Sequence, residues 1–148
     1  MKYLNKYCMN WKLIFGLSLF GLAMAFATVS LITSNIEPIC WLAIFLICAF
    51  LIAKNAQGRY FLHGFLVSLV NCVWVTGVHI MHSGAYMANH AKEVEGYAKM
   101  NTQFGLSVTQ SMLAIGPFVG IFSGIVLGLF AVIASKIFRK QPAMRQMP

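Results

Sequence analysis

The sequence contains no aspartate, and its only acidic residues are Glu37, Glu93 and Glu95. Charged residues of both signs make up 9% of the 148 residues, whereas apolar residues make up 59%. Soluble domains carry about 25% charged residues, so water cannot be the main solvent of this chain. The composition predicts an integral membrane protein surrounded by the lipid bilayer. The length allows a single domain over residues 1–148.

Four long apolar stretches account for most of the chain. A helix that crosses a bilayer needs roughly 20 residues, and we place the spans at 13–32, 38–53, 60–81 and 113–134. We therefore predict an all-α fold, a polytopic four-transmembrane-helix bundle. The first stretch is also similar to a cleavable signal peptide, with small residues at 23–25 or 25–27. Its apolar run continues to Ile32, which favours an uncleaved helix.

Basic residues are distributed unevenly over the two sides that these spans define. The N-terminus, the 54–59 loop and the C-terminal tail carry nine Lys or Arg and no acid. The other side carries Lys92, Lys99 and all three glutamates. Cytoplasmic loops of membrane proteins have an excess of cations, so we expect both termini in the cytoplasm. Short basic clusters between apolar runs also argue against nucleic-acid binding. The nine are Lys2, Lys6, Lys12, Lys54, Arg59, Lys136, Arg139, Lys140 and Arg145.

The chain lacks residues that several functional classes of membrane protein need. The spans contain no acidic residue in their cores, which argues against a small four-helix drug exporter. Three of the spans have no histidine, which argues against haem. The cysteines form no Cys-x-x-Cys pair, and only Cys40 lies near the outer side, which excludes a quinone-linked thiol oxidoreductase. No nucleotide-binding or hydrolase motif is present, so we expect no enzyme activity and no cofactor. The remaining cysteines are Cys8, Cys48 and Cys72.

The last span carries a glycine at every fourth position, which places the glycines on one face of a helix. Small residues let two membrane helices approach closely. The third span has a matching stripe of small residues, and the two spans are consecutive and antiparallel, so we expect them to form a hairpin. A homo-oligomer through the glycine ridge is the competing interpretation. The ridge is Gly116, Gly120, Gly124 and Gly128, and the matching stripe is Gly64, Ser68, Cys72 and Thr76.

Polar residues within and beside the third span allow two further hypotheses. Asn71 lies near its middle, where a buried amide needs a hydrogen-bond partner, so we expect it to link two helices. His79, His82 and His90 lie at the outer end together with two methionines, ligands that suit copper, zinc or nickel. Their spacing matches no established metal motif. The alternative is a polar helix end in water, with an interruption at Ser83 and Gly84.

Residues 86–101 combine apolar positions at helical spacing with charges on the other face. Glu95 and Lys99 are four residues apart and should form an ion pair. This pattern predicts a short amphipathic external helix on the outer membrane surface. The helix would act as a connector between the third and fourth spans or as a lid over the bundle.

The order of these features resembles a known group of proteins. A basic loop, a helix that begins YFLHGFLVSLV, the external segment AKEVEGYAKM and the closing helix IGPFVGIFSGIVLGLF follow one another over roughly residues 54–140. This layout is similar to that of uncharacterised bacterial four-helix membrane proteins of the Bacteroidetes type, a domain of unknown function. The resemblance implies a bacterial inner membrane and no known activity.

We therefore expect a non-enzymatic integral membrane protein, an accessory or scaffold subunit. One alternative is a small oligomeric channel or transporter packed through the Gly116–Gly128 ridge. A second alternative is a metal-binding protein of the outer face. Besides the bilayer, the expected partner is another copy of the chain or another membrane protein.

Overall fold

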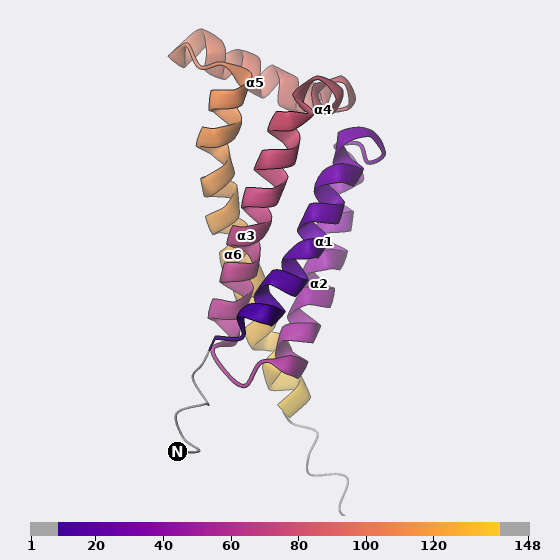
Figure 1. The fold of residues 1–148 in the computed structure, drawn as a ribbon, viewed down its shortest axis with the longest axis vertical. Helices are drawn as coiled ribbons and strands as arrows, with labels where there is room; N and C mark the ends of the chain where they lie inside the picture. Colours follow the sequence, from indigo (N-terminus) through magenta and orange to yellow (C-terminus); the bar gives the residue numbers. More distant parts are fainter. Residues whose placement is uncertain (1–8, 140–148) are drawn as a thin grey trace, which may run out of the picture.

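The computed structural model describes residues 9–139, and all regular secondary structure in this part of the chain is helical. Four of its helices are long and apolar enough to cross a membrane, which confirms the predicted all-α class and the number of apolar helices. Lys2, Lys6, Cys8, Lys140 and Arg145 lie outside the described residues. The helices are α1 (Trp11–Ser30), α2 (Glu37–Asn55), α3 (Tyr60–Met81), α4 (Ser83–Asn89), α5 (Ala91–Phe104) and α6 (Val108–Arg139) (Figure 1).

The local sequence explains where several helices begin and end. Asn10 caps α1, because its side-chain oxygen accepts a hydrogen bond from the backbone N–H of Leu13 at 3.1 Å. Pro38 lies in the first turn of α2, where a backbone N–H has no acceptor within the helix, so the lack of an N–H in proline breaks no helical hydrogen bond. Gly105 ends α5 with φ +67°, in the left-handed region that glycine adopts without strain.

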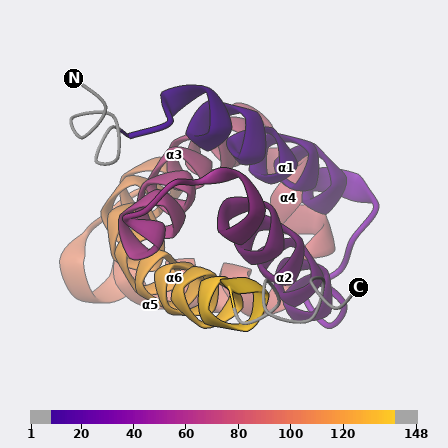
Figure 2. The ribbon, with the colours of Figure 1, turned by 90° about the horizontal axis from the view of Figure 1, so that it is seen from below.

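The four long helices surround a common axis in the order α1, α3, α6, α2 (Figure 2). Helix α3 packs chiefly on α6 and α1, and α2 packs chiefly on α6. Helices α4 and α5 lie across one end of the bundle, and we call them the cap (Figure 1). The opposite end carries Lys12, Lys54, Arg59 and Lys136, and we call it the basic end.

The main hydrophobic core lies toward the basic end, where all four long helices contribute fully buried side chains. Ile14, Ile52, Val67 and Leu127 each have 0% exposure. Outward-facing side chains are also apolar, and Phe118 on α6 is 76% exposed. Large apolar side chains on every outer face suit contact with hydrocarbon rather than water.

The cap differs from the single external helix predicted over 86–101. The chain forms two helices, α4 and α5, with a break at His90, whose φ and ψ are −127° and 65°. The His90 side chain has 0% exposure, so the chain turns inward at this residue, and a continuous surface helix is excluded. Helix α5 itself buries no residue. The predicted Glu95–Lys99 ion pair is present, at 2.7 Å.

Candidate functional site

The glycine ridge of α6 lies against α3 along the length of the hairpin. The stripes run antiparallel, so that Gly116 faces Thr76, Gly120 faces Cys72, and Gly128 faces Gly64. A Cβ placed on Gly64 would lie 2.8 Å from the backbone oxygen of Leu127 and 2.9 Å from the Cα of Gly128. The two backbones therefore touch directly at this point, and each glycine of the ridge has a neighbour on α3.

Polar atoms of α3 and α6 also pair across this contact. The hydroxyl oxygens of Ser68 and Ser123 are 2.7 Å apart. The Cys72 thiol donates to the carbonyl oxygen of Gly116 at 3.0 Å. These bonds satisfy small polar groups that would otherwise be unpaired inside an apolar bundle.

Asn71 does not form the predicted link between helices. Its side chain is 4% exposed, and neither its amide oxygen nor its amide nitrogen has a hydrogen-bond partner. The amide packs against Gly21 of α1, and a Cβ on Gly21 would collide with it. A close apolar contact thus occupies the place where a hydrogen-bonding partner was expected.

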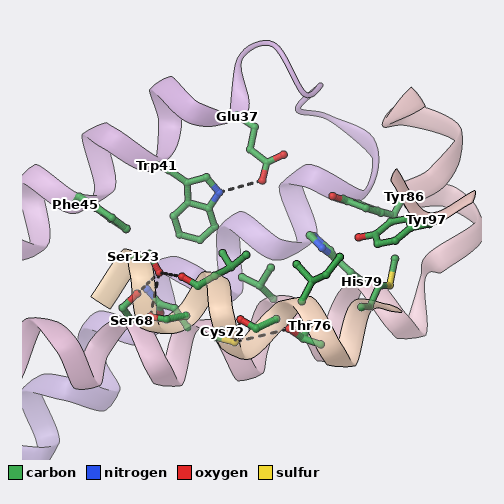
Figure 3. A pocket seen from close by; sticks show the side chains of 17 residues that line it. Glu37, Trp41, Phe45, Ser68, Cys72, Thr76, His79, Tyr86, Tyr97 and Ser123 are labelled. Atoms are coloured by element: carbon green, nitrogen blue, oxygen red, sulfur yellow. Dashed lines mark hydrogen bonds between the residues drawn. The ribbon is translucent and has the colours of Figure 1, made fainter. Parts of the chain in front are cut away.

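A cavity of about 330 Å³ lies between α2, α3 and α6 beneath the cap (Figure 3). Small-molecule sites in proteins usually measure about 300–1,000 Å³. The walls are mainly apolar and aromatic, with a few hydroxyl, thiol and amide groups. The aromatic wall comes from three different helices: Trp41 and Phe45 on α2, Tyr86 on α4 and Tyr97 on α5.

Two of the predicted histidines sandwich a tyrosine at the cap end of this cavity. The ring centroid of Tyr86 lies 4.0 Å from that of His79 and 4.2 Å from that of His90. Both pairs are stacked, with interplanar angles of 23° and 17°. His79 lies on α3, Tyr86 lies on α4, and His90 lies between α4 and α5. The stack therefore joins the cap to the bundle.

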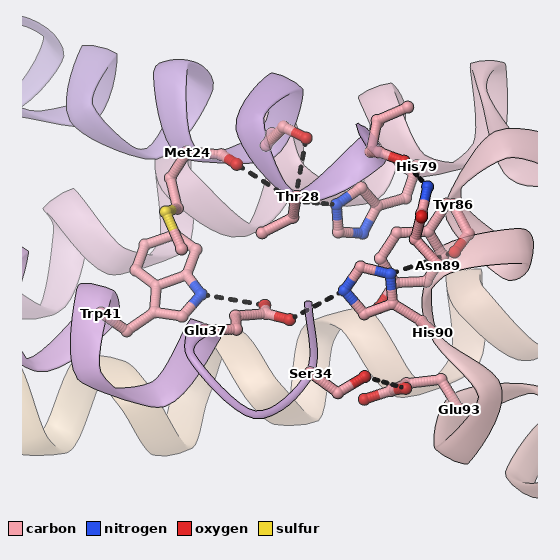
Figure 4. Close-up of polar contacts among 12 residues, drawn as sticks. Met24, Thr28, Ser34, Glu37, Trp41, His79, Tyr86, Asn89, His90 and Glu93 are labelled. Carbon is pink, nitrogen blue, oxygen red and sulfur yellow. Dashed lines mark hydrogen bonds and ion pairs between the residues drawn. The ribbon is translucent and has the colours of Figure 1, made fainter. Parts of the chain in front are cut away.

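His79 continues the polar contacts toward α1. Its Nε2 atom is 2.8 Å from the hydroxyl oxygen of Thr28 (Figure 4). That hydroxyl also contacts the carbonyl oxygens of Met24 and Ala25 at 3.0 and 2.9 Å. Carbonyl oxygens only accept, so the hydroxyl hydrogen points to them, and Nε2 of His79 is the donor to Thr28.

Glu37 brings the first turn of α2 into the same cluster. One carboxylate oxygen accepts a hydrogen bond from the indole N–H of Trp41 at 3.1 Å. The other lies 3.3 Å from Nε2 of His90, within ion-pair distance but without the alignment of a hydrogen bond. Nδ1 of His90 is 3.0 Å from the carbonyl oxygen of Tyr86, which only accepts, so Nδ1 carries a hydrogen.

The end of α1 and the loop between α1 and α2 add contacts to the cap. The Ser34 hydroxyl donates to Glu93 at 2.8 Å, and the Lys92 ammonium donates to the side-chain oxygen of Asn35 at 3.0 Å. Asn89 donates to the backbone oxygen of Val29 at 3.0 Å. The cap is thus held by several directional polar contacts. The basic end is packed mainly by apolar side chains, with a buried imidazole, His63, that accepts a hydrogen bond from the backbone N–H of Asn10 at 3.1 Å.

Burial and nearby carboxylates affect both cavity tyrosines of the cap. Burial raises the pKa of Tyr86, and Glu37 and then Tyr97 and Glu93 add to the effect. Tyr97 is half-buried, and this partial burial likewise raises its pKa, with contributions from Glu93 and Glu37. Both phenols therefore remain neutral donors at physiological pH.

The structure does not assemble the predicted metal site. Across residues 9–139, no three His, Cys, Asp or Glu side chains form a group that could hold a metal ion. The ring of Tyr86 separates His79 from His90, and both imidazoles already contact protein groups. His82 lies apart from the stack, with Nδ1 at 3.1 Å from the Val78 oxygen and its ring against Phe26. The described residues therefore do not bring His79, His82 and His90 together as ligands of one metal ion.

The aromatic wall of the cavity was not predicted from the sequence, although Ser68, Asn71, Cys72, Thr76 and His79, which also line the cavity, were singled out. Glu37 and Trp41 are four residues apart at the start of α2, a spacing that could have indicated their hydrogen bond. Tyr86 and Tyr97 carry no comparable local signal, because they reach the cavity through the turn at His90.

No family model, curated protein or solved structure matches this chain.

Proposed function

We propose that the chain is a polytopic integral membrane protein with both termini in the cytoplasm, in a bacterial inner membrane. The four long apolar helices and the exposed apolar side chains on their outer faces support this proposal. The concentration of cations at the basic end supports the orientation, because Lys and Arg are retained on the cytoplasmic side.

Labelling of single cysteines tests the orientation. In a variant without the native cysteines, Lys99→Cys on α5 should react with a membrane-impermeant maleimide added to intact cells. Gln57→Cys, in the turn between α2 and α3, should react only after the membrane is opened. Labelling of Gln57→Cys in intact cells would reverse the proposed orientation.

We propose that the protein binds a small lipophilic molecule in the cavity beneath the cap and acts as a non-enzymatic accessory protein. The observation that carries this proposal is the cavity of about 330 Å³, walled by aromatic side chains of α2, α4 and α5. At about 30 Å³ for each water-sized group, it has room for on the order of ten such groups. The oligomeric-channel alternative has less support, because α3 covers the glycine ridge that it would use.

The arrangement of hydroxyls and bases supports a binding role rather than catalysis. Thr28 is hydrogen-bonded to His79, but it accepts this bond, whereas a nucleophile donates its proton to the base. Thr28 is also 1% exposed and does not line the cavity. The hydroxyls of Ser68 and Ser123, which do line it, are bonded to each other. The Cys72 thiol, which also lines it, donates its hydrogen to the carbonyl oxygen of Gly116 and has no base beside it among these contacts. A ligand in the cavity therefore meets binding groups and no activated nucleophile.

Native mass spectrometry of the protein released from nanodiscs tests this function. Octanamide, a compound of about the size of the cavity, should give an adduct of one molecule per chain. Val119→Trp, which places an indole in the cavity wall, should abolish the adduct. Val73→Trp, on a 68% exposed surface of α3, should retain it. Equal adducts in both variants would contradict binding in the cavity.

A further inference from the structure

An imidazole nitrogen of His90 and a carboxylate oxygen of Glu37 converge at the cap end of the cavity without an aligned hydrogen bond between them. Because Nδ1 of His90 carries a hydrogen, a neutral imidazole presents a lone pair at Nε2, which lies 3.3 Å from the carboxylate oxygen of Glu37. Two acceptors at this distance repel each other unless a positive charge or a proton lies between or beside them. His90 is fully buried, whereas the Glu37 side chain is 20% exposed, so Glu37 is the accessible member of the pair.

The walls around this carboxylate are aromatic. Trp41, Tyr86 and Tyr97 all line the same cavity as Glu37 (Figure 3). Aromatic faces attract cations through the ring quadrupole, and the attraction is greatest where water is excluded. Because His79 and His90 stack on the two faces of Tyr86, the faces that a cation can use are those of Trp41 and Tyr97. A carboxylate surrounded by aromatic rings is therefore a suitable receptor for an organic ammonium group.

No lysine or arginine lies among the described residues that line the cavity. Glu37 is the one charged residue in that lining within the described part of the chain, and the lining residues of α6 are all uncharged. Lys92 lies on the cap, but its ammonium is bonded to Asn35. The other titratable groups that face the carboxylate and the imidazole are His79 on α3, Tyr86 on α4, and Glu93 and Tyr97 on α5.

We propose that the cap end of the cavity binds a small lipophilic cation, with an ammonium group that donates to Glu37 and an apolar body that lies against the aromatic wall. The proposal rests on the proposed function, since it names the ligand class of the same cavity. The ammonium supplies the positive charge that the Glu37–His90 pair lacks when His90 is neutral. The body, of on the order of ten non-hydrogen atoms, fills the space toward Ser68 and Ser123.

A matched series of eight-carbon compounds tests the inference: octylammonium, octanamide and octanoate. Dissociation constants are measured by titration of adducts in native mass spectrometry. We expect octylammonium to bind about tenfold to hundredfold more tightly than octanamide, the range for a hydrogen bond to a charged group, and octanoate to bind least. Glu37→Gln should reduce the preference for octylammonium to near unity, because glutamine keeps an acceptor for Trp41 but has no charge.

Glu95→Gln is the control for general electrostatic attraction. It removes one negative charge from the same side of the bundle, but Glu95 is 71% exposed and paired with Lys99 outside the cavity. This variant should keep the preference of the wild type for octylammonium.

Tyr97→Leu provides a second test, in the aromatic wall of the cavity. It should weaken octylammonium binding about two- to fivefold with little effect on octanamide binding. Helix α5 buries no residue, so this change leaves the core intact.

The outcomes separate this inference from the function on which it rests. Binding of octanamide with no advantage for octylammonium would overturn the cation inference and leave the cavity as a site for neutral lipophiles. A preference that persists in Glu37→Gln, or that is lost equally in Glu95→Gln, would also overturn it. If none of the three compounds binds, both the inference and the proposed function are wrong.

Discussion

The two ends of the bundle are built from the same apolar helices but are held together differently. At the basic end, Ile14, Ile52, Val67 and Leu127 meet with no exposed surface, and α3 and α6 touch through glycine. At the cap end, α2 presents Trp41 and Glu37 to a cavity, and imidazoles, hydroxyls and a carboxylate connect the helices. Small and branched side chains allow complete packing, whereas aromatic and polar side chains leave space that a ligand can fill.

The largest expected effect concerns the hydrophobic core at the basic end. Ile52→Ala should leave a void in a fully buried core and lower the free energy of unfolding by about 2–5 kcal/mol. Ile115→Ala is the matched control, because Ile115 lines the cavity and is 37% exposed, so its loss creates little new void. Thermal or denaturant unfolding in one detergent measures both. Equal losses would remove the distinction between the two ends.

The contact between α3 and α6 gives the next effect. Gly64→Ala would place a methyl group 2.8–2.9 Å from backbone atoms of α6, so the helices must separate, at an expected cost of about 1–3 kcal/mol. Gly77→Ala, on the same helix, has no atom within 4 Å of the new methyl group and should be neutral or slightly stabilising. If the two variants unfold alike, the close approach at Gly64 does not contribute to stability.

Asn71 should give an effect of the opposite sign. Its amide is buried with two unpaired polar atoms, so Asn71→Leu, of similar size, should raise the unfolding free energy by about 1–3 kcal/mol. Ser68→Ala is the comparison, because Ser68 is hydrogen-bonded to Ser123, and its loss should destabilise the bundle by about 1 kcal/mol. A destabilised Asn71→Leu protein would mean that the amide has a partner in the membrane.

The smallest effect concerns the cap. The pKa of Tyr97 is raised by burial and by Glu93 and Glu37, so the phenol should ionise above its ordinary value of about 10. The folded-state pKa lies above the unfolded one, so the associated stability is present below about pH 10 and is lost as the pH rises further. Glu93→Gln should lower the pH at which Tyr97 is half ionised, measured by ultraviolet titration of the phenol. Tyr97→Phe, which lacks this phenol, identifies the part of the signal that comes from the other tyrosines. An unchanged midpoint would mean that Glu93 does not act on Tyr97.

The predictable part of the fold follows from local pattern. The apolar runs indicated the four long helices, because the length of such a run reflects the thickness of the bilayer. The glycines at every fourth position indicated one face of α6, and the structure places that face against α3. The break at His90 was not predictable in this way, because it depends on contacts with Tyr86 and Glu37.

The sequence by itself determined the class of fold, the four apolar helices and the end of the bundle at which cations gather. Each of these depends on residue type and on spacing along one chain segment, so it can be read without knowledge of neighbours. Only the tertiary structure decided that α3 covers the glycine ridge, that Asn71 lacks a partner, and that Glu37 meets His90 at a cavity. These facts depend on the distance between segments that lie 40 or more residues apart in the chain, a distance set by packing rather than by local pattern.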